Sequence, residues 1–226
     1  MKTKIILLIV AVIVVGGVLL ALRRDKPSMG VETVSPEDMT TSTSTQPASI
    51  EDGNYKITDD QTIGWNAKKR VGGGHNGTID VTKGEFTVKD NSITKGSIDF
   101  SLASLVDLDL EDGKAKTQLE SDLKGEGFFN TEKYPNGSFS VTKASPIVAG
   151  SATLTGNLTL KGKTSEVSFP VMVQADKDMI TLTGTMTFNR TKFGINYASA
   201  SIPGAVKDVI IEDEVGVTIA STFKKK

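Results

Sequence analysis

Few residues of this chain have side chains suited to acid–base, nucleophilic or metal chemistry. Its 226 residues include one histidine, His75, and no cysteine. Without cysteine the chain forms no disulfide, no thiolate zinc site and no thiol nucleophile. With one histidine it forms no multi-histidine metal site, and a histidine-dependent triad would have to use His75 as its base. An enzyme that combines His75 with a nearby carboxylate is a hypothesis, but we predict that the chain is not an enzyme.

Four acidic residues gather in a short segment that resembles a calcium-binding loop. They are Asp107, Asp109, Glu111 and Asp112. A loop of the EF-hand type needs glycine at its sixth position and glutamate at its twelfth, where this chain has Asp112 and Gln118. The match fails, so we expect a solvated acidic loop and predict no metal site and no cofactor.

His75 directly follows three glycines, Gly72, Gly73 and Gly74. Glycine permits positive φ and lets a ligand approach the backbone closely. His75 is therefore a candidate ligand contact at the rim of the fold. The alternative is that these glycines only make a tight connection between two strands.

The charges of the chain are balanced. There are 26 Lys and Arg residues and 27 Asp and Glu residues, which gives a net charge of −1. A protein that binds nucleic acid through its phosphates needs a surplus of cations. We therefore predict that nucleic acid is not a partner.

Apolar and polar residues alternate over most of the chain beyond residue 50, which is the period of a half-buried strand. In the clearest case, residues 180–188, apolar residues and Gly184 alternate with threonines. Turn signals such as Lys89-Asp90-Asn91 and Lys161-Gly162-Lys163 separate the runs and predict antiparallel hairpins. The pattern predicts about eight strands, near residues 54–70, 76–89, 92–103, 136–144, 151–161, 164–175, 179–190 and 208–223.

One segment, residues 114–124, has helical character, with Leu119 and Leu123 on the same face. One helix cannot cover so many strands, so the sheet must bury its apolar face on itself, as a barrel or a sandwich. Glycines lie within or at the ends of several strands, at Gly84, Gly96, Gly156 and Gly184. Such glycines often mark bends or close approaches of another backbone. We therefore predict an all-β, eight-stranded antiparallel barrel with one short helix.

The N-terminal residues predict a membrane segment before this domain. Residues 5–22 carry no charge and, at about 1.5 Å per residue, nearly match the hydrocarbon core of a bilayer. We assign residues 1–25 to a transmembrane anchor, with a cleaved signal peptide as the alternative. Residues 26–49, rich in Ser, Thr and Pro, form a flexible linker, and residues 50–226 form the folded domain. Basic residues flank both ends of the anchor, so charge does not decide its orientation.

Phenylalanines supply much of the predicted interior. The candidates lie on strands or directly after the helix: Phe86, Phe100, Phe128, Phe129, Phe139, Phe169 and Phe188. In an eight-stranded barrel, such side chains either fill the interior or line a cavity for one apolar ligand. The alternating pattern leaves both alternatives open, and we treat all these phenylalanines as candidates for lining a ligand cavity.

Several short motifs follow one another between Tyr55 and Phe223. They are Gly64-Trp65, Gly74-His75-Asn76-Gly77, Gly84-Glu85-Phe86, Leu119-Glu120-Ser121-Asp122-Leu123-Lys124, Gly127-Phe128-Phe129, Lys133-Tyr134-Pro135-Asn136-Gly137-Ser138-Phe139, the hairpin of residues 156–164 and Arg190-Thr191-Lys192-Phe193-Gly194. Each motif is short, but the ordered series is specific. It resembles the YceI-like family.

The resemblance implies an extended, lipocalin-like antiparallel barrel whose apolar interior holds a long isoprenoid or a similar amphiphile. Family members are typically extracytoplasmic in bacteria, which implies a domain in the periplasm or at the cell surface, or secreted if the N-terminus is cleaved. Phe128, Phe129 and Phe139 are the best candidates for the lining. Two features depart from the family pattern: the N-terminal anchor and the acidic loop at residues 106–113.

These observations predict a non-enzymatic protein that binds an isoprenoid lipid or quinone-like amphiphile in its barrel lumen. Its role would be transport, storage or sequestration at the cell envelope, with residues 5–22 in the membrane. The alternative is a surface or stress-related module that contacts protein partners and has a filled barrel core. A homodimer is compatible with either function.

Overall fold

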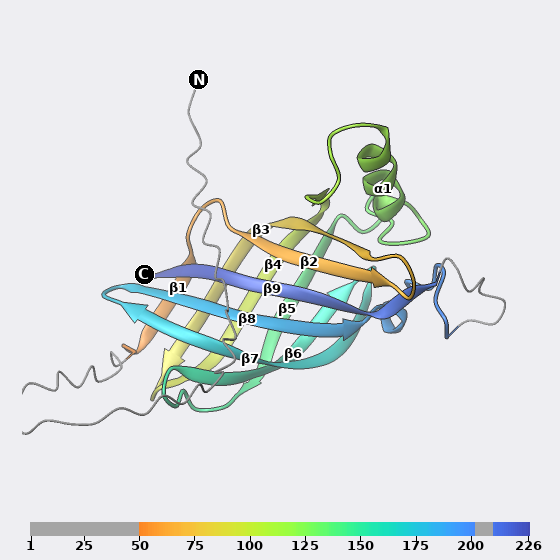
Figure 1. Cartoon of the computed structure of the whole chain (residues 1–226). Coiled ribbons are helices and arrows are strands. Elements are labelled where there is room, and N and C mark those ends of the chain that lie inside the picture. Colours follow the sequence, from red (N-terminus) through yellow and green to blue (C-terminus); the bar gives the residue numbers. More distant parts are fainter. Residues whose placement is uncertain (1–49, 202–209) are drawn as a thin grey trace, which may run out of the picture. The chain divides into compact units, whose positions relative to one another are not determined.

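The computed structural model describes residues 50–201 and 210–226, so the predicted anchor and linker lie outside the described residues. Within these ranges the chain forms nine strands, one α-helix and a short 3₁₀-helix, η1 (Figure 1). The elements are β1 (Gly53–Ile57), β2 (Thr62–Lys69), β3 (Gly74–Lys89), β4 (Ser92–Asp107), α1 (Lys114–Lys124), β5 (Asn136–Ala144), β6 (Ser151–Leu160), β7 (Lys163–Asp176), β8 (Met179–Asn189), η1 (Arg190–Phe193) and β9 (Ile211–Lys225). In this part of the chain no helix has the length and apolar character needed to cross a membrane.

The strands form one antiparallel sheet that closes on itself. Neighbours follow the order β3-β2-β9-β8-β7-β6-β5-β4, and β4 pairs again with β3. β1 also pairs with β3 and β9, so β1 and β2 occupy the same position of the ring one after the other. The nine strands therefore fill eight positions, which confirms the predicted eight-stranded antiparallel barrel with one short α-helix.

The strand that the sequence predicts near residues 54–70 is divided in two. β1 ends at Ile57 and β2 begins at Thr62. Between them Asp60 has a φ of 57°, a left-handed conformation that interrupts an extended strand. The prediction of one continuous strand is wrong here because a local turn separates the two pairing segments.

The alternating pattern translates directly into the barrel core. On β8, Ile180, Leu182, Met186 and Phe188 are buried, whereas the threonines between them are half-buried or exposed. The inward rows of all strands form one apolar cluster. Burial of each large apolar side chain contributes about 1.5–3 kcal/mol, so these rows are the main stabilising feature of the domain.

Two-residue turns set the register of the hairpins. Asp90 and Asn91 join β3 to β4 with φ angles of 50° and 56°. Lys161 and Gly162 join β6 to β7 with φ angles of 49° and 71°. Consecutive left-handed residues are typical of the type I′ turn, whose twist matches that of the flanking strands.

Gly156 lies where two neighbouring groups approach the backbone closely. A Cβ atom at this position would meet the ring of Phe139 and the carbonyl oxygen of Ser140. The absence of a side chain lets the Phe139 ring lie over the backbone of the adjacent strand. The close approach that the sequence predicts at Gly156 is therefore confirmed.

The barrel has two different ends. At the first, which we call the α1 end, β2 and β4 finish, β3 begins, and α1 lies beyond the strands (Figure 1). At the second, the β1 end, lie β1, the β3–β4 hairpin and the C-terminal residues of β9. The predicted helix at residues 114–124 is confirmed, and its position makes it part of the cover of one barrel end.

Candidate ligand-binding site

The interior of the α1 half contains a cavity of about 110 Å³. We call it the α1 cavity. Its walls are apolar side chains from the strands, and α1 with the segment after it adds Leu123, Phe128 and Phe129. A closed barrel thus supplies a concave apolar site, the usual character of small-molecule sites.

Six of the seven phenylalanines named from the sequence line the α1 cavity: Phe100, Phe128, Phe129, Phe139, Phe169 and Phe188. The four on strands are buried, whereas Phe128 and Phe129 are only half-buried. Phe86 does not line this cavity and lies in the other half of the barrel. The structure therefore brings together most of the predicted lining residues and separates Phe86 from them.

Phe128 and Phe129 lie on a segment that the end of α1 holds in place. The amide of Phe129 donates to the carbonyl oxygen of Leu123 at 3.1 Å, and the amide of Phe128 donates to that of Gly125 at 3.1 Å. The Phe128 ring also contacts Tyr197, with 5.2 Å between the ring centroids. The mouth of the cavity is therefore covered by side chains from a loop rather than from a strand.

A second, smaller cavity of about 40 Å³ lies in the β1 half. The two cavities share four lining residues, Ile98, Phe139, Phe169 and Ile219. The rings of Phe139 and Phe169 lie 5.4 Å apart, centroid to centroid. These two rings therefore form a partition between the cavities.

Arg190 is a charged residue in the wall of the α1 cavity that sequence reasoning did not select. Its guanidinium donates to four backbone carbonyl oxygens, those of Ile195, Tyr197, Ile211 and Glu212. Burial lowers the pKa of Arg190, and the charge of Asp213 opposes that shift. The signal was present in the sequence, because residue 190 continues the inward row of β8 beyond Phe188.

The Arg190 contacts join η1 to the start of β9. Asp213 Oδ1 lies 3.4 Å from Arg190 Nη2, and Asp213 also accepts a hydrogen bond from the Ser201 hydroxyl. Burial raises the pKa of Asp213, but the hydrogen bonds from Ser201 and Ser199 and the Arg190 charge together bring it below its usual value. This cluster closes the α1 end beside the cavity and leaves the guanidinium engaged with the backbone.

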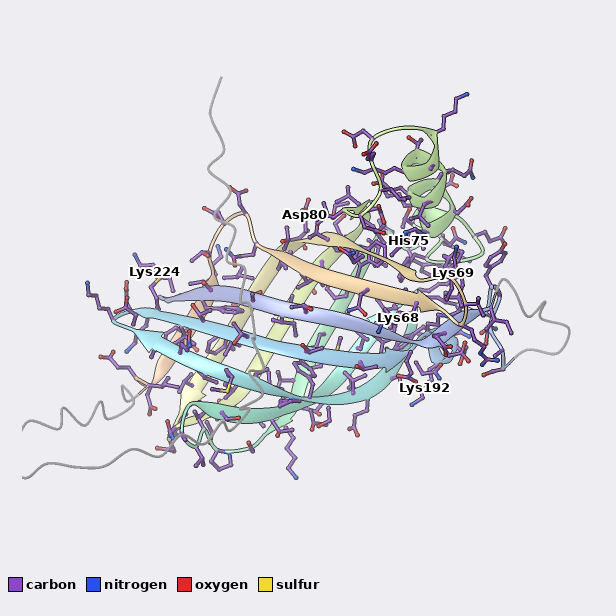
Figure 2. The ribbon with its side chains drawn as sticks, in the orientation of Figure 1. Lys68, Lys69, His75, Asp80, Lys192 and Lys224 are labelled. Carbon is purple, nitrogen blue, oxygen red and sulfur yellow. The ribbon has the colours of Figure 1, made fainter. Side chains whose placement is uncertain are left out.

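His75 lies at the α1 end, as does Lys69, whereas Lys224 lies at the opposite end (Figure 2). The imidazole is half-buried and is not among the residues that line the α1 cavity. Its Nδ1 lies 3.2 Å from Asp109 Oδ2 and 3.7 Å from Asp107 Oδ2. The hydrogen bond from the Asn76 amide, with the His75 contacts, lowers the pKa of Asp109.

A shallow hollow of about 300 Å³ lies beside His75. Its lining residues are Asn66, Ala67, Lys68, Lys69, Gly73, Gly74, His75 and Asn76. None of them offers a hydroxyl nucleophile or a carboxylate. The carboxylates that contact His75, those of Asp107 and Asp109, are not among the residues that line the hollow.

Comparison with known proteins agrees with the barrel geometry. A family model described as the YceI-like domain matches residues 55–223. No curated protein matches the chain significantly. The structure is similar to that of BcnA from Burkholderia cenocepacia, with a TM-score of 0.53 and 20% identity, over 71% of this chain and 94% of that chain.

It is also similar to a polyisoprenoid-binding domain from Saccharophagus degradans that is implicated in plant cell wall breakdown. That comparison has a TM-score of 0.53 and 10% identity, and it covers 78% of this chain and 100% of the other. At these identities the two solved structures establish the fold. The family model spans most of the chain, from β1 to β9, and so the chain belongs to the YceI-like domain family.

Proposed function

We propose that the barrel binds an isoprenoid lipid or quinone-like amphiphile in the α1 cavity, without catalysis, for transport, storage or sequestration. The observation that carries this proposal is the apolar cavity beneath the half-buried rings of Phe128 and Phe129. The polyisoprenoid-binding domain with the same fold supports the choice of ligand class.

Hydrophobic burial would supply most of the affinity. Apolar surface removed from water contributes about 25 cal/mol per Å², so each added isoprene unit strengthens binding as long as it finds space. Arg190 is engaged with four carbonyl oxygens and offers no free charge to a headgroup. We therefore expect the polar end of the ligand to remain at the mouth, near Phe128.

A long chain would need more room than the α1 cavity of about 110 Å³ offers. Two routes extend it: displacement of the loop that carries Phe128 and Phe129, or separation of the Phe139 and Phe169 rings. The first opens the mouth, and the second joins the α1 cavity to the smaller one.

We further propose that residues 5–22 hold the domain at a membrane and that the barrel is extracytoplasmic. The uncharged length of these residues and the Ser/Thr/Pro-rich linker after them support the tether. A tethered barrel would meet lipid-resident ligands at a raised effective concentration. If the N-terminus is cleaved instead, the same domain would be secreted.

The rival function is a protein-interaction module whose core is filled. The tight aromatic packing in the β1 half, where Phe86 and Phe223 lie 4.6 Å apart, favours this alternative. This alternative predicts that added lipid does not enter the α1 cavity.

Native mass spectrometry of residues 50–226 with short, medium and long polyprenols tests the proposal. This part suffices because it contains the whole closed sheet, and 94–100% of the two solved relatives' chains match it. We expect one polyprenol per barrel and affinity that rises with chain length. The same spectra give the oligomeric state.

Phe129→Asp is the matched variant, because it places a charge at the cavity mouth and should abolish uptake while the circular dichroism spectrum is retained. Met172→Asp is the control, since Met172 is 48% exposed on β7 and does not line the α1 cavity. Uptake that survives Phe129→Asp in a folded protein would contradict the assigned mouth. No uptake by the wild type at any chain length would favour the interaction module.

A further inference from the structure

We propose that His75, Asp107 and Asp109 form a binding site for a divalent transition-metal ion of the Zn²⁺ type at the α1 end of the barrel. The three side chains offer one nitrogen and two carboxylate oxygens within 4.8 Å of one another. This site lies outside the lining of the α1 cavity and is independent of the proposed lipid binding.

The register of the barrel brings these residues together from distant parts of the chain. β3 and β4 pair with Gly77 opposite Asp107, so the start of β3 lies beside the end of β4. The amide of Leu108 donates to the carbonyl oxygen of Asn76 at 2.9 Å and extends this contact beyond the strand. His75 and Asp109 therefore meet where β3 begins and β4 ends.

In Asp107 and in Asp109, one carboxylate oxygen accepts a backbone hydrogen bond and the other is directed toward His75. Asp107 Oδ1 accepts from the amide of Leu110 at 2.8 Å, and Asp109 Oδ1 accepts from the amide of Asn76 at 3.0 Å. The Oδ2 atoms of both residues lie toward His75 Nδ1, at 3.7 Å and 3.2 Å. Outer contacts that orient ligand side chains in this way are typical of metal sites.

Asp107 supplies the observation that points to a cation. Its side chain is fully buried, and its Oδ2 atom has no hydrogen-bond partner among the described residues. A buried carboxylate oxygen without a partner carries a large desolvation cost. A metal ion between Asp107 and His75 would supply the missing interaction.

The distances and atom types select the class of ion. Zinc bonds to imidazole nitrogen and carboxylate oxygen are about 2.0–2.2 Å, so two ligand atoms of a tetrahedral site lie roughly 3.3–3.6 Å apart. The His75–Asp109 and His75–Asp107 separations of 3.2 and 3.7 Å lie close to this range. An imidazole nitrogen favours zinc-like ions over Mg²⁺ and Ca²⁺, which prefer all-oxygen sites. Water would complete the coordination.

The proposal replaces the prediction of no metal site made from the sequence. That prediction compared residues 107–118 with a contiguous calcium loop and did not include His75. Glu120 adds a link to the helix, because its Oε1 accepts a hydrogen bond from the Asp107 amide at 2.9 Å. The ligands therefore come from β3, the end of β4 and the loop after it, and α1 supports the site through Glu120.

The test uses the full chain in detergent, stripped with a chelator and dialysed against graded Zn²⁺, with bound zinc measured by mass spectrometry. We expect one zinc ion per chain. Mutation of a residue that only hydrogen-bonds to a metal ligand lowers metal affinity by about 10–100-fold. Loss of a ligand itself, in His75→Ala or Asp107→Asn, should therefore weaken zinc binding by about 100-fold or more. Asp107→Asn keeps the oxygen that accepts from Leu110.

Asp112→Asn is the matched control, since Asp112 belongs to the same acidic segment but pairs with Lys116 at 2.9 Å. It should bind zinc like the wild type. His75 is the only histidine, so its imidazole ¹⁵N signals should shift on zinc addition without ambiguity. Zinc binding that survives His75→Ala, a wild type that takes up no zinc, or Ca²⁺ that competes equally would each overturn the proposal.

Discussion

The two halves of the barrel share most of their strands but pack their interiors differently. In the β1 half, Tyr55 stacks on Phe86 with 5.2 Å between centroids, and Phe86 packs edge-on against Phe223 at 4.6 Å. The cavity there is about 40 Å³, against about 110 Å³ in the α1 half. One closed sheet therefore supports a nearly filled half and a hollow half.

The difference between the halves comes from what covers each end. At the β1 end, the short strand β1 brings Tyr55 inward, where it is 1% exposed, and its hydroxyl donates to the carbonyl oxygen of Glu51 at 2.8 Å. At the α1 end, the cover is α1 and the loop with Phe128 and Phe129, and α1 has no buried residue. The end closed by a strand is packed, whereas the end closed by a helix and a loop is covered by the half-buried rings of Phe128 and Phe129.

The largest expected effect is a difference in stability between two variants that each remove one aromatic ring, Phe223 in the β1 half and Phe128 in the α1 half. Phe223→Ala should lower the free energy of unfolding of residues 50–226 by about 3–5 kcal/mol, because it removes a buried ring that neighbours cannot replace. Phe128→Ala should lower it by about 1 kcal/mol or less, since the ring is half-buried. Urea denaturation measures both. Equal losses would mean that the two ends are packed alike.

A smaller effect is expected from the partition between the cavities. Phe169→Leu should cost about 1–1.5 kcal/mol and join the two cavities, so that the preference among polyprenols moves toward longer chains. Phe188→Leu is the control, because Phe188 lines the α1 cavity but not the smaller one. Competition between short and long polyprenols in native mass spectrometry measures the preference. An identical shift in both variants would show that Phe169 has no special role as a partition.

The smallest expected effect is on the pH dependence of the α1 end. The pKa of Asp213 in the folded chain lies below its ordinary value, although burial opposes this, because Ser201, Ser199 and Arg190 favour the carboxylate. The stabilisation that ionised Asp213 gives the folded chain is therefore complete above the unfolded pKa of about 3.9. It is lost as the pH falls through the lower pKa of the folded chain. Between pH 5 and pH 2 the wild type should lose about 2–4 °C more in Tm than Asp213→Asn.

Hydrogen exchange at the acidic pH locates this effect. We expect faster exchange in η1 and the start of β9, which Arg190 joins, before any change in β1. Exchange that rises first at the β1 end, or an equal Tm loss in Asp213→Asn, would contradict the assignment of acid sensitivity to the α1 end.

Most strand positions and the helix follow from local pattern, because alternation reports the side of the sheet that each residue faces. The predicted helix at residues 114–124 and the turns at Asp90-Asn91 and Lys161-Gly162 match the structure for the same local reason. The break at Asp60 was missed because alternation continues on both sides of a turn that does not change the inward rows. Arg190 was missed because only the apolar residues of the inward row were considered, and these end at Phe188, two residues before Arg190.

The sequence by itself determined which side chains point inward, how many positions the barrel has, and the order of the motifs that mark the family. Only the tertiary structure decided how much space those side chains leave, because cavity volume depends on all strands and on the loop with Phe128 and Phe129 together. It also decided that His75 meets Asp107 and Asp109, more than thirty residues away, since their contact depends on the register of β3 against β4. The local pattern determines whether each side chain faces the interior or the solvent. The distance between residues remote in sequence is set only when the sheet closes into a barrel.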